Sequence, residues 1–570
     1  MRNTKSDLVI IGGGGAGLAA AVAAAENGCT GVTVLEKRTA IGGNTIMSAG
    51  LFAVDSPAQK RAAIEFRRDE AFNIAMEWAH WKTNPRLVRA YINKSGDTIK
   101  WLENKGLFFE CVPMYPNQPL LVWHWNKEYG AGMMKVLQEE CNRLGVKILT
   151  RTAATKLLVG EGGNISGVLA EKEGEKFSIA ADSVIIATGG YGGNKQLLKK
   201  HSPVYRENMK CDGIPHTGDG IIMATEIGAA NEGLGFLLMS GPQVPNAVLL
   251  SIDYEPEPKQ VQLMGIALEP NTLWVNKRGE RFVDEATSYH HYVCSNAVNR
   301  QPDNISYTLF DHKIMQTMTD EGLIIGLGRY RIDERIGMPG LERELKFQTK
   351  GFMCVETVDD ESCNGCGICV ENCPAQAIEL KTTGAKNKKS GGKAVIQYVE
   401  DCRLCKSCEL SCPQAAISFA PLKKIEPHVK ISSSWNTIAK WMGCEPAVLK
   451  ASVDEYNNAC DHGYDHLFNK RREFMLPLRE PPFYAIKGNS DFLDTIGGIK
   501  INERMEVLDT DDYPIPSLYA AGVTTGGWQS DTYNDYLPGA ASGFAIISGR
   551  IAGENAAALL HKPTRRGKSG

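Results

Sequence analysis

The chain has 570 residues, of which 43% are hydrophobic and 23% are charged, so it can bury several cores and suggests about two to four domains. The formal net charge of −3 argues against a dedicated nucleic-acid-binding protein. No apolar run approaches the roughly 18 residues of a membrane-spanning helix. The first predicted strand begins at residue 7, which leaves no room for a signal peptide. We therefore expect a soluble, cytoplasmic protein.

A dinucleotide-binding fingerprint opens the chain. The apolar run 7–11 predicts a buried parallel strand, and the glycines after it open a predicted Ala-rich helix that ends at about Glu26. Gly12, Gly14 and Gly17 fit G-x-G-x-x-G, which permits a tight turn, a close pyrophosphate and close helix packing. The run 32–35 predicts the next strand, which leads into Glu36, where an acid should bind ribose hydroxyls. A tight turn alone is the alternative, but these elements in this register favour a dinucleotide site.

Two cysteine runs of equal spacing follow in the second half of the chain. They are Cys363-x2-Cys366-x2-Cys369-x3-Cys373-Pro374 and Cys402-x2-Cys405-x2-Cys408-x3-Cys412-Pro413. This spacing is typical of bacterial ferredoxins with two [4Fe-4S] clusters, in which the fourth cysteine of each run binds the other cluster. The predicted ligand sets are Cys363, Cys366, Cys369 with Cys412, and Cys402, Cys405, Cys408 with Cys373. Structural zinc is disfavoured, because zinc ligands come in two pairs.

A basic stretch separates the two cysteine runs. Residues 382–393 contain Thr, Gly, Asn, Ser and several lysines, which predicts an exposed turn. A merely solvated hairpin tip is the simpler interpretation. Contact with an acidic electron-carrier protein is the alternative.

A set of motifs runs through the chain outside the cysteine runs. They are Gly42-Gly43-Asn44-Thr45 with Ser48-Ala49-Gly50, Ala187-Thr188-Gly189-Gly190, Thr217-Gly218-Asp219-Gly220, the run 275–285, Thr495-Ile496-Gly497-Gly498, the run 514–522, and Ser548-Gly549-Arg550-Ile551-Ala552-Gly553. With these motifs the chain resembles a flavoprotein family, the flavoprotein subunits of fumarate reductase and succinate dehydrogenase and their soluble relatives, which include ketosteroid dehydrogenases. The resemblance implies FAD rather than NAD. Because there is only one dinucleotide fingerprint, no NAD(P)H domain is expected.

The resemblance also implies a fold and a domain organisation. The expected fold is α/β, a Rossmann-like FAD-binding domain with an inserted α+β capping domain, itself interrupted by a 2[4Fe-4S] ferredoxin-like domain. The expected boundaries are 1–236 and 488–560 for the FAD-binding domain, 237–351 and 429–487 for the cap, 352–428 for the ferredoxin domain, and 561–570 for a basic tail.

The resemblance places FAD contacts at single positions. A histidine at the position of Asn44 is bonded covalently to the flavin in the membrane-bound relatives, so FAD should be noncovalent here. Val523 departs from the glutamate that is usual after Ala-Ala-Gly, which removes one expected contact. The expected FAD-binding residues are Gly12, Gly14, Ala16, Gly17, Glu36, Lys37, Gly43, Asn44, Thr45, Ala154, Thr188, Gly189, Asp219, Gly522, Ala540 and Ser542.

The substrate side departs from the fumarate reductases of the family, which hold two carboxylates with histidines and arginines. Asp494 stands at the position of one histidine, and the other has no counterpart in residues 237–242. Tyr536 replaces a carboxylate-binding arginine, and Tyr289 replaces the arginine that delivers the proton. A small dicarboxylate is therefore an improbable substrate, because a desolvated dianion needs cations.

The replacing side chains suggest their own chemistry. Tyr536 with Gly539 resembles the pair that binds the keto oxygen in ketosteroid dehydrogenases, although the spacing is one residue shorter. A tyrosine hydroxyl near a backbone N–H can stabilise an enolate, and Tyr289, His290 or His291 could move the proton. The predicted catalytic residues are Tyr289, Tyr536, Gly539 and His290. Packing alone is the alternative for each of them, and also for His124 and His216.

Together these patterns predict a one-to-two-electron converter. Electrons from a protein carrier, such as a ferredoxin, a flavodoxin or a partner oxidoreductase subunit, would pass through the two clusters to FAD and on to an organic substrate. The favoured function is an ene-reductase acting on a C=C bond conjugated to a carbonyl, or a dehydrogenase forming one. The alternatives are an electron-transfer subunit of a larger complex and, disfavoured, a fumarate reductase-like dicarboxylate enzyme.

Overall fold

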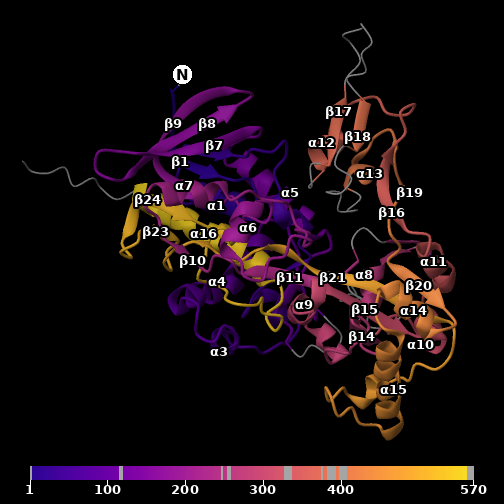
Figure 1. Ribbon diagram of the computed structural model, residues 1–570. Coiled ribbons are helices and arrows are strands. Elements are labelled where there is room, and N and C mark those ends of the chain that lie inside the picture. Colours follow the sequence, from indigo (N-terminus) through magenta and orange to yellow (C-terminus); the bar gives the residue numbers. More distant parts are fainter. Residues whose placement is uncertain are drawn as a thin grey trace, which may run out of the picture.

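The computed structural model describes residues 3–114, 120–244, 248–252, 259–325, 337–373, 377–381, 393–396 and 407–560. Three groups of elements are visible in Figure 1: a large α/β part that holds both ends of the described chain, a second part built around another sheet, and a small cysteine-rich segment. Most of the predicted basic turn, Cys402, Cys405 and the expected tail lie outside the described residues.

A mostly parallel sheet forms the centre of the α/β part. Its strands run in the order β23-β24-β9-β1-β2-β6, and β1 pairs in parallel with both β2 and β9. Leu8, Val9 and Ile10 are fully buried, as expected for a parallel strand covered on both faces. The bounds are β1 Asn3–Ile11, β2 Val32–Leu35, β6 Lys147–Leu149, β9 Glu175–Ile186, β23 Glu506–Leu508 and β24 Pro514–Ala520, with the hairpin β7 Thr152–Val159 and β8 Ile165–Lys172 attached to β9.

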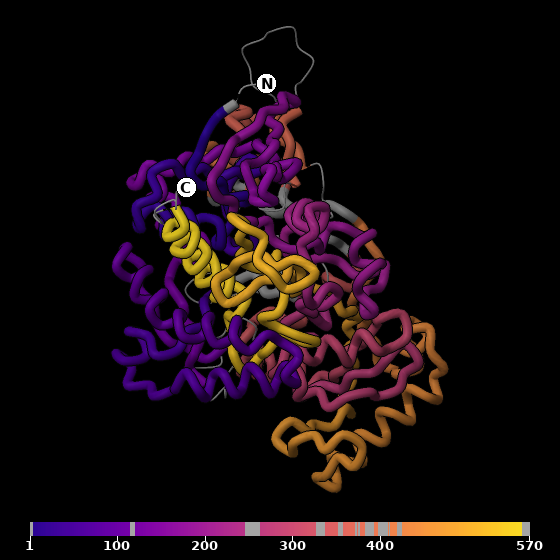
Figure 2. Tube along the Cα trace, turned by 90° about the vertical axis from the view of Figure 1, so that its left-hand side faces the viewer, coloured from indigo at the N-terminus to yellow at the C-terminus, as the bar shows by residue number. Residues whose placement is uncertain are grey.

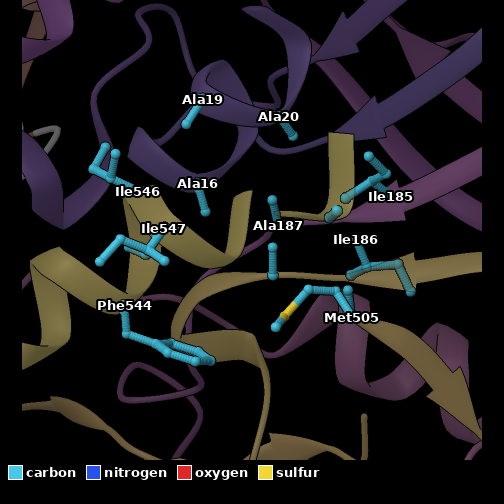
Figure 3. Close-up of a cluster of buried hydrophobic side chains, with 14 of the residues drawn as sticks. Ala16, Ala19, Ala20, Ile185, Ile186, Ala187, Met505, Phe544, Ile546 and Ile547 are labelled. Atoms are coloured by element: carbon cyan, nitrogen blue, oxygen red, sulfur yellow. The ribbon is translucent and has the colours of Figure 1, made fainter. Parts of the chain in front are cut away.

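Helix α1, Gly15–Glu26, crosses the C-terminal helix α16, Ala540–Leu560, at very short range. A Cβ on Gly549 would lie 2.2 Å from the carbonyl oxygen of Ala16, and one on Gly553 would lie 2.3 Å from that of Ala20. Figure 3 shows Ala16, Ala19 and Ala20 beside residues of α16 and the end of β9. The predicted strands and Ala-rich helix are confirmed, because the apolar run 7–11 lies in β1 and the helix ends at Glu26.

Further elements complete the α/β part. They are β3 Gly50–Phe52, β4 Glu110–Val112, β5 Trp123–Trp125, α2 Pro57–Arg61, α3 Arg68–Trp78, α4 Pro85–Glu103, α5 Tyr129–Arg143, α6 Lys195–His201, α7 Asp219–Glu226, β10 Asn231–Glu232 and β22 Gly498–Ile499. No helix within the described residues is both long enough and apolar enough to cross a bilayer.

The second part has its own antiparallel sheet and hydrophobic core. Strands β11, Leu237–Gln243, and β21, Phe483–Thr495, pair antiparallel, with Leu238 opposite Asp494. The remaining elements are β12 Val248–Ile252, β13 Lys259–Gln262, α8 Leu263–Ala267, β14 Leu273–Asn276, α9 His291–Asn299, β15 Ile305–Phe310, α10 His312–Glu321, α11 Leu341–Gln348, β20 Val429–Ser432, α14 Trp435–Met442 and α15 Pro446–His462. Figure 2 shows this part extending below the α/β part.

The cysteine-rich segment contains two strand pairs and two short helices. Strand β16, Phe352–Val358, pairs antiparallel with β19, Ile417–Lys424, and β17, Ile378–Lys381, pairs with β18, Lys393–Ile396. Helices α12, Ile368–Asn372, and α13, Ser407–Ser411, carry Cys369 and Cys408. Figure 1 shows β16 and β19 linking the second part to these helices.

Candidate active site

One cavity of about 380 Å³ lies where the carboxyl ends of the central strands meet. Ile11, Leu35, Ala187 and Ala521 line it at or just after the ends of β1, β2, β9 and β24. This edge of an open α/β sheet is the usual ligand-binding crevice. All expected FAD-binding residues except Gly17 and Ala540 line this cavity.

The glycine turn fits a bound dinucleotide. Gly12 has φ of +112°, and a Cβ there would lie 2.2 Å from the carbonyl oxygen of Ala187. A Cβ on Gly17 would lie 1.9 Å from the carbonyl oxygen of Gly12, so Gly17 serves helix packing rather than ligand contact. At Gly14 the nearest atoms to a Cβ are 3.9 Å away, which leaves the backbone open to an approaching phosphate.

Charged residues cluster at the β2 end of the cavity. Glu36 is buried, and its Oε2 accepts a 2.8 Å hydrogen bond from the N–H of Gly13. Lys37 donates to Asp219 Oδ2 and to Thr217 Oγ1, each across 2.7 Å. Burial alone would raise the pKa of Asp219, but hydrogen bonds from Lys37 and Thr217 hold it below the usual value. This end can receive the ribose and phosphate groups of a dinucleotide.

Asn44 is fixed by two hydrogen bonds inside the cavity. Its Nδ2 donates to Asp494 Oδ2 across 2.6 Å, and its Oδ1 accepts from the N–H of Ile214 across 2.6 Å. His216 Nδ1 is buried without a hydrogen-bond partner in the described structure and lies 3.8 Å from Asp494 Oδ2. Asp494 therefore contributes a carboxylate to the lining of the cavity, held by Asn44.

Permanent positive charge is confined to one end of this cavity. Among the described residues that line it, only Lys37 and Arg38 are lysine or arginine, and both follow Glu36 directly. Leu238 and Asp494 also line the cavity, and β11–β21 pairing sets them opposite each other. Within the described lining, a dianionic ligand would meet no lysine or arginine other than Lys37 and Arg38.

Of the four residues predicted to be catalytic, only Gly539 lines the cavity. Tyr536 is 38% exposed, and its ring packs against Trp78 and His290 with centroid distances of 5.4 and 4.9 Å. The ring of Tyr289 packs against Phe474 at 5.7 Å. The structure thus brings Tyr536 and His290 together, but neither is among the residues that line the cavity.

The other histidines that we considered are mostly buried. His124 is fully buried, with Nε2 2.6 Å from Ser56 Oγ, and burial lowers its pKa to about 4. Burial also lowers the pKa of His291 to about 4, and that of His290. His124 and His291 are therefore neutral near pH 7, which makes them poor proton donors.

Two other tyrosines line the cavity, and the sequence did not reveal them. The rings of Tyr292 and Tyr533 meet edge to face at 4.7 Å. Tyr533 is buried, and its hydroxyl accepts a 2.8 Å hydrogen bond from the N–H of Ala541. Burial raises the pKa of both hydroxyls well above the usual value. The one-residue mismatch in the Tyr536–Gly539 spacing was the available signal that a different tyrosine reaches the site.

Four cysteines surround a second, small cavity within the cysteine-rich segment. Cys363, Cys366, Cys369 and Cys412 line it, which is the set that the spacing predicts for one cluster. Cys373 Sγ and Cys412 Sγ accept hydrogen bonds from the N–H groups of Ala377 and Ala416 at 3.2 and 3.3 Å. No three His, Cys, Asp or Glu residues of the described chain are arranged to hold a single metal ion. A four-iron cube differs from such an ion, because each of its cysteines binds its own iron.

Comparison with known proteins gives consistent results. A vinyl phenol reductase of Lactiplantibacillus plantarum is 29% identical over 566 residues, 98% of each chain. A urocanate reductase of Eggerthella lenta is 26% identical, over 98% of this chain and 75% of its own length. These relatives are oxidoreductases.

Solved structures show the same fold. A flavocytochrome c3 fumarate reductase in an open conformation superposes with a TM-score of 0.63 and 22% identity, over 97% of this chain and 78% of its own. A 3-ketosteroid-delta4-(5alpha)-dehydrogenase of Rhodococcus jostii gives 0.65 and 19% identity, over 97% of both. The FAD-binding domain family matches residues 7–536. The expected α/β fold and flavoprotein resemblance are confirmed, and the chain belongs to the FAD-binding domain family of FAD-dependent oxidoreductases.

Proposed function

We propose that this flavoprotein reduces a C=C bond conjugated to an oxygen function, an enone carbonyl or a phenol, in a small uncharged substrate. The reverse dehydrogenation is the same chemistry. The observation that carries the proposal is the Tyr292–Tyr533 pair on the wall of the FAD cavity. The name of the vinyl phenol reductase supports it, because a vinyl phenol is a neutral compound whose C=C bond is conjugated to a phenol. The name of the urocanate reductase supports only the reduction of an unsaturated organic compound, since urocanate is a carboxylate.

The charge of the cavity favours a neutral substrate. Asp494 is 5% exposed and lines the cavity, so it would repel a second carboxylate. Desolvating a dianion without fixed cations costs several kcal/mol. A phenol or an enone has no such cost, because its oxygen needs only hydrogen-bond donors.

Tyr533 is suited to bind the conjugated oxygen. Its hydroxyl oxygen accepts the N–H of Ala541, so the hydroxyl proton is left to donate. Donors aimed at an oxygen that gains negative charge stabilise the transition state, especially in a dry site. Tyr292 lines the same cavity beside Tyr533 and would pass a proton to the carbon skeleton, with solvent restoring the proton to its hydroxyl. Bound FAD, once reduced, would supply the hydride, so that hydride and proton together saturate the C=C bond.

Electron supply is proposed to come from the cysteine-rich segment. Convergence of Cys363, Cys366, Cys369 and Cys412 on one cavity supports one [4Fe-4S] cluster, and the equal spacing of the second run supports another. We propose a protein electron carrier as the donor, and a cytoplasmic location, because such clusters need reducing conditions. Strand β16 beginning at Phe352 and β20 beginning at Val429 support the division into 1–236, 237–351, 352–428, 429–487 and 488–560.

A substrate panel tests this function. Anaerobically reduced protein should be reoxidised rapidly by a vinylphenol or a neutral enone, and by fumarate far more slowly than about 1 per second, a typical lower rate for enzymes. Flavin absorbance reports reoxidation. A phenol whose side chain has no C=C bond serves as the control. Turnover of fumarate at enzymatic rates would overturn the proposed charge selectivity. Failure of every unsaturated compound, together with a stoichiometric partner on purification, would favour an electron-transfer subunit.

FAD should be released when the protein is denatured. Both ends of the Asn44 amide are bound, to Asp494 and Ile214, and an amide cannot form the histidyl link of the membrane-bound relatives. Acid precipitation should therefore leave the flavin in the supernatant, where its absorbance is measured after removal of protein. Flavin that stays with the pellet after washing would show a covalent bond at another residue.

A further inference from the structure

One side chain connects the FAD cavity to the cysteine-rich segment. Arg38 lines the cavity, and its Nη2 donates to the carbonyl oxygen of Cys373 across 3.5 Å, although the two residues are 335 positions apart. The N–H of Arg38 donates to Glu36 Oε1 across 2.8 Å. The contact therefore leads from Cys373 to the end of β2, beside the dinucleotide-binding turn.

The second, cysteine-lined cavity lies entirely within the segment. Its lining residues all lie between 363 and 417, so none belongs to the α/β part. Cys366 is exposed, whereas Cys363, Cys369 and Cys408 are buried. Lys393 Nζ donates to the carbonyl oxygen of Cys363 across 2.5 Å, which holds β18 against Cys363. Among the described cluster cysteines, Cys366 is thus the exposed one, and Cys373 contacts the α/β part through Arg38.

We propose that the segment docks on the α/β part through Cys373, so that the cluster served by Cys373 passes electrons to FAD. The cluster at exposed Cys366 then receives electrons from the external carrier. Arg38 is a positioning residue in this arrangement, because it fixes the separation across which electrons move. The inference rests on the proposed function, since it requires both clusters and FAD.

The electron count is consistent with this order. Two successive one-electron transfers from the Cys373 side, with two protons from solvent, reduce one FAD, and the carrier replaces each electron at the Cys366 side. Transfer slows steeply as redox centres separate, so a contact that fixes their separation controls the rate. A guanidinium between a thiolate-bound cluster and a phosphate-bearing cofactor also adds favourable charge.

The first test replaces Arg38 in the holoprotein. The clusters are reduced by rapid photoreduction without substrate, and the bleaching of the flavin is followed. Arg38→Ala should slow this bleaching by roughly tenfold or more, because a small misplacement of the segment relative to FAD has a large kinetic effect. Iron content and the EPR spectra of the clusters should match those of the wild type, and both proteins are compared at saturating added FAD, because Arg38 also lines the FAD cavity. Arg143→Ala is the matched control, since Arg143 is an exposed arginine paired only locally with Glu140. A wild-type bleaching rate in Arg38→Ala would overturn the docking role.

The second test asks directly which cluster lies nearer FAD. Reduced clusters speed the magnetic relaxation of a nearby flavin radical, which pulsed EPR measures without turnover. The enhancement should persist in Cys366→Ala and fall in Cys373→Ala, and the opposite pattern would overturn the order. If either cysteine variant loses all iron, the Arg38→Ala rate decides. Wild-type protein that binds FAD but no iron would instead contradict the proposed function.

Discussion

Replacing Tyr533 with phenylalanine should slow substrate turnover by about 10²–10³, the usual effect of removing one oxyanion donor. Tyr533 lines the cavity, and the N–H of Ala541 orients its hydroxyl. Loss of the oxygen leaves the ring and its packing against Tyr292 in place. FAD content should therefore be unchanged, while a phenolate inhibitor should bind more weakly, as measured by the shift of the flavin spectrum.

Two further variants make this result specific. Tyr513→Phe is the control for loss of a hydroxyl, since Tyr513 is 69% exposed. Tyr536→Phe separates the hypothesis drawn from the sequence from the one drawn from the structure. If Tyr536 binds substrate, its variant should be the slow one. If Tyr533 does, Tyr536→Phe should turn over at nearly the wild-type rate, because its ring packs on Trp78 and His290.

The cofactor end of the site was predictable because its signals are local. Gly12, Gly14, Gly17 and Glu36 belong to one strand, turn and helix unit, whose backbone geometry dictates residue type at each position. The structure agrees with the physical role of each glycine, including the packing role that keeps Gly17 out of the cavity. A local motif fixes its own geometry, so sequence spacing was sufficient there.

The substrate end was not predictable, because it depends on packing between distant elements. Tyr292 lies at the start of α9, and Tyr533 lies in the loop before α16. The two rings meet only when the two parts of the fold come together. Tyr536 is partly exposed, whereas Tyr533, three residues earlier in the chain, is buried and lines the cavity. Similarly, the Arg38–Cys373 contact joins residues with no sequence relation. Motif alignment led to the loop that holds Tyr533 and Tyr536, but spacing alone could not tell which of the two lines the cavity.

The buried ion network of the second part should be its most sensitive point. Glu285 and Lys470 are fully buried, with Lys470 Nζ 3.1 Å from Glu285 Oε2. Arg281 Nη2 lies 2.8 Å from both Glu285 Oε2 and Asp465 Oδ2. Burial alone would raise the pKa of Glu285, but Lys470 and Arg281 hold it below the usual value. Each charge in this network is therefore stable only while its partners are present.

Glu285→Ala should lower the free energy of unfolding of this part by about 3–5 kcal/mol, because it leaves Lys470 and Arg281 buried with too little negative charge. Urea unfolding followed by tryptophan fluorescence measures the change, since Trp274 lies beside the network and donates its backbone N–H to Glu285 Oε1. Glu280→Ala is the matched control and should change stability by less than about 1 kcal/mol, because Glu280 pairs with Arg278 at an exposed position.

The depressed pKa of Glu285 adds a pH dependence with a definite sign. Its stabilisation is present above the pKa of about 4.3 for an unfolded glutamate and is lost as the pH falls through the lower folded value. Equal midpoints for the wild type and Glu285→Ala at neutral pH would show that the network contributes no net stability.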